Sequence, residues 1–508
     1  MMQYEKICEN LYSSVSHNKK MKKYIFIFVV LGLVLPIGLY GCATNPVTQK
    51  QQFVLLSEEQ ELAIGKKMDP QIIKEYGLYD DPELQSYVDM IGQKIAKQSD
   101  RPELFYHFKV LNSPIVNAFA IPGGYIYFTR GILALLNSEA ELAGVLGHEV
   151  GHVTARHAVQ QYTKAQGYQI MATIASIFVP EFQNRNLQQL ADIAATGIIR
   201  GYGREMEMES DRLGIKYSYK ARYNPKAVPD FLSVLKLASK GKEERGVFHG
   251  MFATHPDTTK RINAAKKKVN DLLVKKKPEG LSFHTDRYLN QIEGLIYGSD
   301  PKEGVINGMV FQHPVMQFEI TYPEGWKIFN TKSAVISKDK EKDEKYVSQL
   351  LTEALGKRIS TKNYAKKFFK RNRIKLLSEK SVEINGLEAY VTTFQDTRRK
   401  APMMVMAAFI LWQDKMFFVS GSSKVRDFRT GKKFFTQIID SFRGLAKEEA
   451  NSIKPERIKV YVAREGDTIK SVAKKYEKDP QTIALINGFE KDDTSLETGR
   501  KIKVLANY

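Results

Sequence analysis

Residues 138–157 read SEAELAGVLGHEVGHVTARH, and within them two histidines flank a glutamate at a spacing of four. On a helix, His148 and His152 lie one turn apart on the same face, so both imidazoles can bind a single metal ion. Glu149 lies beside them, where a carboxylate can take a proton from a metal-bound water without binding the metal itself. The stretch therefore predicts a zinc-dependent hydrolase.

The residues around this motif predict that it lies on a helix. Ser138 and Glu141 have the spacing of a capping box, and apolar residues follow at helical intervals as far as Val150. The alternative is a pair of core or solvated histidines beside a surface glutamate. The helical context favours the metal site over that alternative.

A catalytic zinc needs a third protein ligand, and acidic candidates lie in residues 202–214, YGREMEMESDRLG. This segment is predicted as a second helix carrying Glu205, Glu207, Glu209 and Asp211. Their spacing alone does not choose among them. Glu207 and Asp211 share a face, so one can bind metal while the other accepts a hydrogen bond from a ligand histidine. Acidic residues at the start of a helix can also merely complement its dipole.

With these two segments, the chain resembles the gluzincin metallopeptidases of the CAAX prenyl protease and HtpX type, especially their soluble periplasmic lipoprotein members. That family pairs its His-Glu-x-x-His with a Glu-x-x-x-Asp, which Glu207 to Asp211 match. The resemblance implies that Glu207 is the third ligand of one Zn²⁺ per chain and that Asp211 supports a ligand. Ser210 replaces the usual Ala, and Gly203 the frequent Ser, without loss of a functional group.

A possible substrate-binding strand lies upstream of the motif. Residues 117–124, NAFAIPGG, and the strand-like residues 125–129 resemble the active-site edge strand of that family. The resemblance implies that Asn117, Ala118 and Phe119 receive an extended peptide as an added strand, through main-chain hydrogen bonds. The alternative is an ordinary hairpin that ends in a Pro-Gly-Gly turn.

Downstream, Thr254-His255-Pro256 with Arg261 resembles a family motif whose histidine faces the metal. The resemblance implies that His255 either stabilises the oxyanion or occupies the open metal position in a latent state. Arg261 is expected behind the ligands. By helical geometry, His157 points off the ligand face and is expected to form structural hydrogen bonds, whereas His249 has no predicted partner.

The N-terminal residues resemble a lipoprotein leader. A basic start at Met21, an apolar stretch and Gly41 before Cys42 predict a signal peptide over residues 21–41, after an upstream mis-start at 1–20. By resemblance to bacterial lipoproteins, Cys42 carries lipid. Ala43, the next residue, favours anchoring in the outer membrane, with the enzyme facing the periplasm. The alternative, an uncleaved anchor, leaves the enzyme on the same side.

Two segments beyond the peptidase region carry strand and module signals. Asn385-Gly386 between strand-like runs predicts a hairpin, and residues 403–412 predict a buried strand. This region resembles a PsbP or Mog1-type sheet module and is expected to bind a partner or position substrate. The pattern of residues 458–504 resembles a LysM module, so either peptidoglycan binding or a packing role is expected.

The predicted fold class is multidomain: a mainly α zincin-type peptidase domain with a small β-sheet, an α+β sheet domain, and a small βααβ LysM-like module. The predicted boundaries, in chain order, are mis-start 1–20, signal peptide 21–41, tether 42–57, peptidase 58–275, linker 276–305, α+β domain 306–446, linker 447–457 and LysM-like module 458–508. With Cys8 in the leader and Cys42 lipidated, no disulfide is expected.

The formal net charge of +20 suits anionic headgroups or an acidic wall, but lysines are spread throughout. A solvated lysine-rich surface is therefore favoured for runs such as Lys366 to Arg371, and no nucleic acid partner is expected. Residues 168–179 are too short to span a bilayer and are predicted to cover the active-site cleft, with contact at a membrane surface as the alternative.

Together these features predict a lipid-anchored zinc endopeptidase of the cell envelope that degrades misfolded or misassembled envelope proteins, with the substrate class implied by resemblance. The alternative is an assembly chaperone or peptidoglycan-bound scaffold whose zinc site is held latent by His255.

Overall fold

The computed structural model of the chain describes residues 42–164, 202–240, 255, 258–275, 279–331, 334–340, 345–357, 359–398 and 401–507. The predicted leader, the predicted cleft helix at 168–179 and His249 lie outside these ranges. Within them, no helix combines the length and the apolar character that crossing a bilayer requires.

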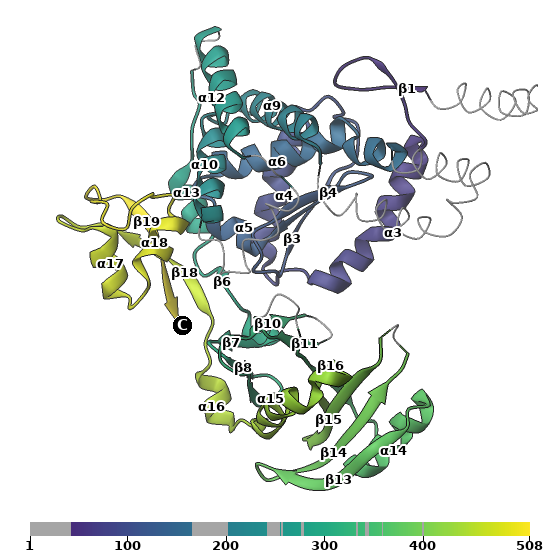
Figure 1. Ribbon diagram of the computed structural model, residues 1–508. Helices are drawn as coiled ribbons and strands as arrows, with labels where there is room; N and C mark the ends of the chain where they lie inside the picture. The colour runs from purple at the N-terminus through teal and green to yellow at the C-terminus, as the bar shows by residue number, and fades with distance from the viewer. Residues whose placement is uncertain are drawn as a thin grey trace, which may run out of the picture. The chain divides into compact units, whose positions relative to one another are not determined.

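The described residues form two compact units, which confirms a multidomain organisation with a helical N-terminal region and a sheet-rich C-terminal region (Figure 1). The first unit runs to Gln291 and includes Ala484–Lys491. The second comprises Ile292–Ile483 and the residues from Asp492 onward.

Helices surround a small three-stranded sheet in the first unit (Figure 1). Its strand order is β3-β5-β4, with β3 parallel and β4 antiparallel to β5. Its elements are β1 (Cys42–Thr44), β2 (Gln51–Phe53), α3 (Glu58–Tyr76), α4 (Pro82–Ala96), β3 (His107–Leu111), β4 (Ala118–Ile121), β5 (Tyr125–Thr129), α5 (Arg130–Leu135), α6 (Glu139–Thr154), α9 (Arg204–Lys220), α10 (Ala227–Lys240), α12 (Thr258–Lys275) and α13 (Thr285–Gln291).

Helix α6 is the core of this unit, since every one of its residues is buried. It packs against α4, α9 and α10, and against β4 at the edge of the sheet. Its approach to α9 depends on glycine, because a Cβ atom on Gly147 would lie 3.0 Å from Cα and O of Gly214. The close crossing brings side chains of both helices to one point.

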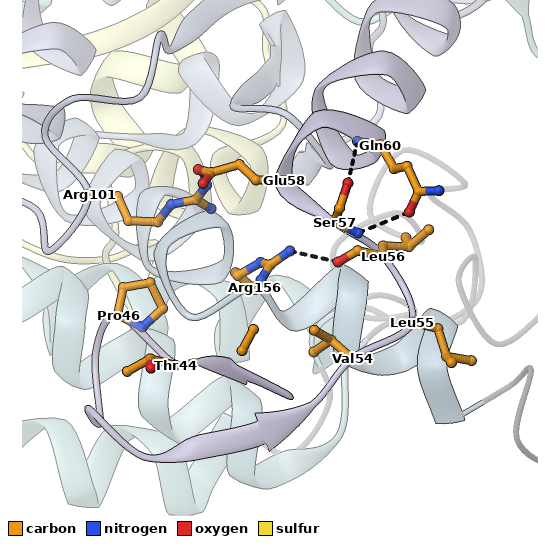
Figure 2. Close-up of a pocket in the computed structure, with 11 residues that line it drawn as sticks. Thr44, Pro46, Val54, Leu55, Leu56, Ser57, Glu58, Gln60, Arg101 and Arg156 are labelled. Atoms are coloured by element: carbon orange, nitrogen blue, oxygen red, sulfur yellow. Dashed lines mark hydrogen bonds and ion pairs between the residues drawn. The ribbon is translucent and has the colours of Figure 1, made fainter. Parts of the chain in front are cut away.

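The N-terminal hairpin of β1 and β2 packs beside the end of α6, and the cavity there has a volume of 480 Å³ (Figure 2). Arg156, which is buried, and Arg101, which is partly buried, line it. Arg156 Nε donates to Glu61 at 3.0 Å, and Arg101 pairs with both Glu58 and Glu61. These carboxylates balance the arginine charges, and Arg156 Nη2 also donates to the Leu56 carbonyl at 3.1 Å. Of these contacts, the one with Leu56 holds the predicted tether beside the end of α6.

The second unit contains a seven-stranded antiparallel sheet of order β10-β11-β12-β16-β15-β14-β13 and a four-stranded sheet of order β17-β9-β8-β7. Its elements before residue 446 are β6 (Ile296–Tyr297), η3 (Pro301–Glu303), β7 (Val305–Asn307), β8 (Val310–His313), β9 (Phe318–Thr321), β10 (Lys327–Asn330), β11 (Val335–Lys338), β12 (Val347–Ala354), α14 (Thr361–Asn372), β13 (Leu376–Ile384), β14 (Leu387–Asp396), β15 (Met403–Trp412), β16 (Lys415–Lys424), η4 (Val425–Asp427), α15 (Phe428–Asp440) and β17 (Arg443–Gly444).

Each face of the large sheet carries its own apolar core. Residues such as Phe435 of α15 and Phe417 fill one core, whereas Phe369 of α14 and Phe409 fill the other. The predicted hairpin is present, since Asn385 and Gly386 have φ of 49° and 81° between β13 and β14. Two positive φ values match the twist of the flanking strands.

The last elements are α16 (Lys447–Ser452), β18 (Glu456–Val462), α17 (Ile469–Lys475), α18 (Pro480–Ile486) and β19 (Lys501–Asn507). From β18 onward the order is βααβ. Strand β18 pairs with β19 on one side and with β6 on the other. Both predicted linkers therefore contain regular structure: α13, β6 and η3 lie within 276–305, and α16 within 447–457.

Candidate metal centre

Helix α6 begins where its sequence predicts, but the capping box is only half formed. Ser138 Oγ accepts from the Glu141 N–H at 3.1 Å and caps the helix. The Glu141 carboxylate accepts from the Asn137 N–H at 2.7 Å, one residue before the N-cap. The Glu141 side chain therefore satisfies the backbone N–H one residue before the one that it would satisfy in a standard capping box.

Four buried donors converge where α6 and α9 cross. His148, His152, Glu207 and His255 each offer an atom within 4.8 Å of the others. Nε2 of His148 and Nε2 of His152 are 3.0 Å apart, and the Glu207 carboxylate oxygens lie 3.6 Å and 3.4 Å from them, respectively. Of the four acidic candidates on α9, Glu207 is the one in this cluster.

The spacing of these atoms fits a tetrahedral metal ion. Ligands bound about 2.0 Å from zinc in tetrahedral geometry are about 3.3 Å apart. The three separations above bracket that value. Two imidazole nitrogens facing each other at 3.0 Å also need a proton or a cation between them. Two imidazoles and a carboxylate are a ligand set that suits zinc.

His255 reaches the same point from the segment before α12. Its Nδ1 lies 2.9 Å from both oxygens of Glu207 and 3.4 Å from Nε2 of His148. It is almost fully buried. His255 therefore occupies the side of the cluster where a fourth ligand belongs.

Glu149 is fully buried and accepts no hydrogen bond at either carboxylate oxygen within the described part of the chain. Nε2 of His255 lies 3.7 Å from its Oε1. Burial raises the pKa of Glu149 above its usual value, despite nearby His255 and His148. A buried carboxylate with free lone pairs and a raised pKa has the properties of a general base for water.

Asp211 and Arg261 lie behind the cluster. Oδ1 of Asp211 is 2.9 Å from Nδ1 of His148, the nitrogen opposite the one that faces the cluster. Arg261 binds the Asp211 carboxylate through two contacts of 2.7 Å and lies 2.8 Å from Glu207. Burial alone raises the pKa of Asp211, but the charge and hydrogen bonds of Arg261, together with His148, outweigh burial and lower the pKa to about 2.

His152 has its own neighbours. Nδ1 of His157 lies 2.9 Å from Nδ1 of His152, so His157 does not face the cluster but contacts a residue that does. The Tyr202 ring stacks on the His152 ring with centroids 3.9 Å apart. Sequence reasoning gave Tyr202 no role, because nothing in its local pattern signals a contact with a helix 50 residues away.

The remaining acidic candidates and the predicted substrate strand can also be placed. Glu205 is exposed in the first turn of α9, as expected of a dipole complement. Ala118 and Phe119 lie on β4, the edge strand that packs against α6, and Asn117 directly precedes it. Ala118 is buried, and Phe119 stacks on Tyr127. The outer edge of β4 is unpaired among the described strands.

The fold and site define a class of protein. Residues 82–269 match the model of Peptidase family M48, and residues 461–505 match the LysM domain. The chain thus carries an M48 metallopeptidase domain followed by a LysM domain, which confirms the expected gluzincin-type and LysM-like regions.

Particular relatives are known. The beta-barrel assembly-enhancing protease of Yersinia pestis is 29% identical over 260 residues, which cover 48% of this chain and 50% of that protein. The mitochondrial metalloendopeptidase OMA1 of Arabidopsis thaliana is 31% identical over 208 residues, 40% of each protein. The chain spans about half the length of the first curated relatives that it matches.

Among solved structures, cyanobacterial PsbP from Synechocystis sp. PCC 6803 aligns with 29% of this chain and 98% of its own. The sequence identity is 16% and the TM-score 0.23. This likeness is too distant to bear on the function of the seven-stranded sheet.

Proposed function

We propose that the chain is a zinc endopeptidase in which His148, His152 and Glu207 hold the metal. The observation that carries this proposal is the convergence of these ligand atoms on one buried point. Glu149 lies beside that point, and among the described residues its carboxylate accepts no hydrogen bond. When bound, zinc polarises the scissile carbonyl and lowers the pKa of a bound water.

The protein side chains then do the proton transfer. Glu149 takes the proton of the attacking water and delivers it to the leaving amine. Because water is the nucleophile, no covalent intermediate forms. Asp211 and Arg261 fix the orientation of His148 and Glu207 by the contacts described above. Burial of the whole group strengthens each of these electrostatic contacts.

We propose that the substrate is an extended peptide that adds to the edge of β4, with Asn117, Ala118 and Phe119 along it. Main-chain pairing at a sheet edge is insensitive to side-chain identity and so suits many substrates. The name of the Yersinia pestis relative supports envelope proteins during assembly as the substrate class. We further propose that lipid on Cys42 anchors the enzyme in the envelope, at the outer membrane facing the periplasm.

Glu149→Gln tests the proposed chemistry. The variant keeps the ligand atoms, so it should bind zinc like the wild type but hydrolyse casein about 10² to 10⁴ times more slowly. Zinc content by atomic emission and turnover with and without a chelator are the measurements. Retained hydrolysis in the variant, or chelator-insensitive hydrolysis in the wild type, contradicts the mechanism.

A second candidate function is a latent site closed by His255, and the position of its Nδ1 beside Glu207 and His148 favours it. His255→Ala opens a ligand position to water, so casein hydrolysis should rise several-fold while zinc affinity falls. If His255 instead stabilises the oxyanion, the same variant loses turnover. The two roles thus predict opposite changes in one assay.

We propose that the LysM domain contacts peptidoglycan, because residues 461–505 match that domain. The full chain is expected to pellet with insoluble peptidoglycan, and a chain that stays in the supernatant contradicts this contact. We also propose that the domain of residues 306–446 binds a partner or positions substrate.

A further inference from the structure

A chain of contacts leads away from His152, which is a metal ligand in the function proposed above, on which its interpretation rests. Nδ1 of His157 lies 2.9 Å from Nδ1 of His152. Nε2 of His157 lies 3.3 Å from Oε2 of Glu209. His157 is 1% exposed, so its contact with His152 lies out of reach of bulk water, whereas the Glu209 side chain is partly exposed.

The direction of these hydrogen bonds follows from the metal site. If Nε2 of His152 binds metal through its lone pair, Nδ1 of this neutral imidazole carries the proton and donates. Nδ1 of His157 must then accept, which places the proton of His157 on Nε2. That N–H points to the Glu209 carboxylate, an acceptor. The hydroxyl of Ser210, 3.3 Å from Nδ1 of His157, is a second donor to the same nitrogen.

We propose that His157 is a positioning residue, which fixes the tautomer and ring orientation of His152 and is itself oriented by Glu209. Asp211 has the corresponding place behind His148 and Arg261 behind Glu207. Each of the three ligands is thereby supported by a different buried group. In this arrangement Glu209 orients His157 and does not bind the metal.

The test compares two replacements of His157 in the full chain. His157→Phe keeps the ring volume but accepts no hydrogen bond, and zinc should bind about 10 to 100 times more weakly. His157→Asn keeps an acceptor near Nδ1 and should recover most of that affinity. Zinc affinity is measured by competition with a chromophoric chelator, and thermal unfolding of the metal-free proteins is measured in parallel.

Arg212→Ala is the matched control, because Arg212 is half exposed and contacts Glu209 from its solvent side at 3.1 Å. It should leave zinc affinity unchanged. A merely structural His157 would lower metal-free stability and leave zinc affinity unchanged in both variants, which overturns the inference. Failure of the wild type to bind zinc instead overturns the proposed function.

Helix α14 carries a concentration of positive charge that is independent of the metal site. Between Glu353 and Glu379 the chain has nine basic residues and no acidic one. Five of them lie on the exposed side of α14, whose other side packs on the sheet through Ala365 and Phe369. These exposed cations are Lys362, Lys366, Lys367, Lys370 and Arg371.

This basic face weakens its own helix. Like charges stand four apart in three pairs, and each such pair is destabilising. Within the part of the chain that the structure describes, none of the five cations forms an ion pair. Lys370 and Arg371 suit the negative end of the helix dipole, but Lys362 lies in the first turn, where a cation is unfavourable. Repulsion without local compensation indicates that an external anion balances the charge.

We propose that the α14 face binds the anionic headgroups of a phospholipid bilayer. A flat row of long cationic side chains on the outer side of a helix matches a plane of phosphates, and each Lys or Arg near such a surface adds attraction. Single-stranded nucleic acid is disfavoured, because the rings of Phe368 and Phe369 pack against Phe409 of the sheet and are not presented to bases for stacking.

The test uses residues 43–508, which lack both the predicted apolar leader and Cys42, so that neither an apolar segment nor lipid contributes to vesicle binding. This chain should float with vesicles that contain phosphatidylglycerol but not with pure phosphatidylcholine, and added salt should weaken the binding. Lys366→Glu, Lys367→Glu and Lys370→Glu together should weaken it at least about 100-fold.

The control is Arg429→Glu, Lys432→Glu and Lys433→Glu on α15, which covers the opposite face of the sheet and receives the same change in charge. It should retain most of the binding. Equal loss in both triple variants means that only net charge matters and overturns the assignment. Binding to soluble polyphosphate but not to anionic vesicles overturns the bilayer as the partner.

Discussion

At the scale of single residues, the proposed metal ligands are contacted from behind by groups that do not face the cluster. The Asp211 carboxylate joins Nδ1 of His148 to the guanidinium of Arg261, and all three side chains are buried. A buried charge that loses its partner is expensive, so the pair stabilises the fold only as long as both members are present. The ligand geometry and the stability of the domain are thus linked through one carboxylate.

Asp211→Ala is therefore expected to lower both zinc affinity and stability. Zinc should bind about 10 to 100 times more weakly because His148 loses the carboxylate that lies 2.9 Å from its Nδ1. The metal-free domain should lose about 3 kcal/mol because Arg261 loses a buried partner. Chelator competition and thermal unfolding measure the two effects. Glu205→Ala, which removes an exposed carboxylate of the same helix, should change neither.

At the scale of elements, the crossing of α6 and α9 determines whether Glu207, the proposed third ligand, reaches His148 and His152. A Cβ atom on Gly214 would lie 3.0 Å from the backbone nitrogen of His148 and 3.1 Å from the Gly144 carbonyl. Both atoms belong to the helix backbone and cannot rotate away. The two glycines at the crossing therefore allow a separation that larger residues prevent, and Glu207 depends on it.

Two serine substitutions on α9 test this idea. Gly214→Ser should push the helices apart, destabilise the domain by about 1 to 3 kcal/mol and weaken zinc binding. Gly203→Ser places the same side chain at the N-cap, where no atom lies within 4 Å, and should be neutral or stabilise by about 1 kcal/mol. The measurements are the unfolding midpoint and the zinc affinity of each variant. If both variants have the same midpoint and affinity, the close crossing of α6 and α9 does not position Glu207.

At the scale of the whole molecule, the two units can be followed separately in solution. Both tryptophans of the chain, Trp326 and Trp412, lie in the second unit, so intrinsic tryptophan fluorescence reports that unit alone. The same unit holds His313 among aromatic rings at 7% exposure. Its Nδ1 accepts from the Met316 N–H at 3.3 Å, which requires the neutral form.

Burial lowers the pKa of His313 to about 4, below the value of about 6.5 in the unfolded chain. The unfolded state then binds a proton more readily, so stability present above pH 6.5 is lost as the pH falls toward 4. We expect the free energy of unfolding of the second unit to fall by about 1 to 2 kcal/mol between pH 7 and pH 5. Urea unfolding followed by tryptophan fluorescence measures it, and His313→Asn should remove the dependence. An unchanged pH dependence in that variant contradicts the assignment.

Some features of this protein are determined locally and could be predicted from sequence. The i, i+4 spacing places His148 and His152 on one face wherever a helix forms, and Ser138 starts that helix. Asn385-Gly386 allows the positive φ values of a tight hairpin without reference to the rest of the chain. In each case the physical cause acts within a few residues.

Other features required the tertiary structure. Spacing left the four acidic residues of α9 equivalent as ligands, and only the family resemblance singled out Glu207. The crossing of α9 with α6 is what places Glu207 at the histidines. The stacking of Tyr202 on His152 and the contact of His157 with the same ring likewise join separate segments. Sequence determined which side chains a helix presents on one face. Packing decided which faces meet, because that depends on how closely two backbones can approach.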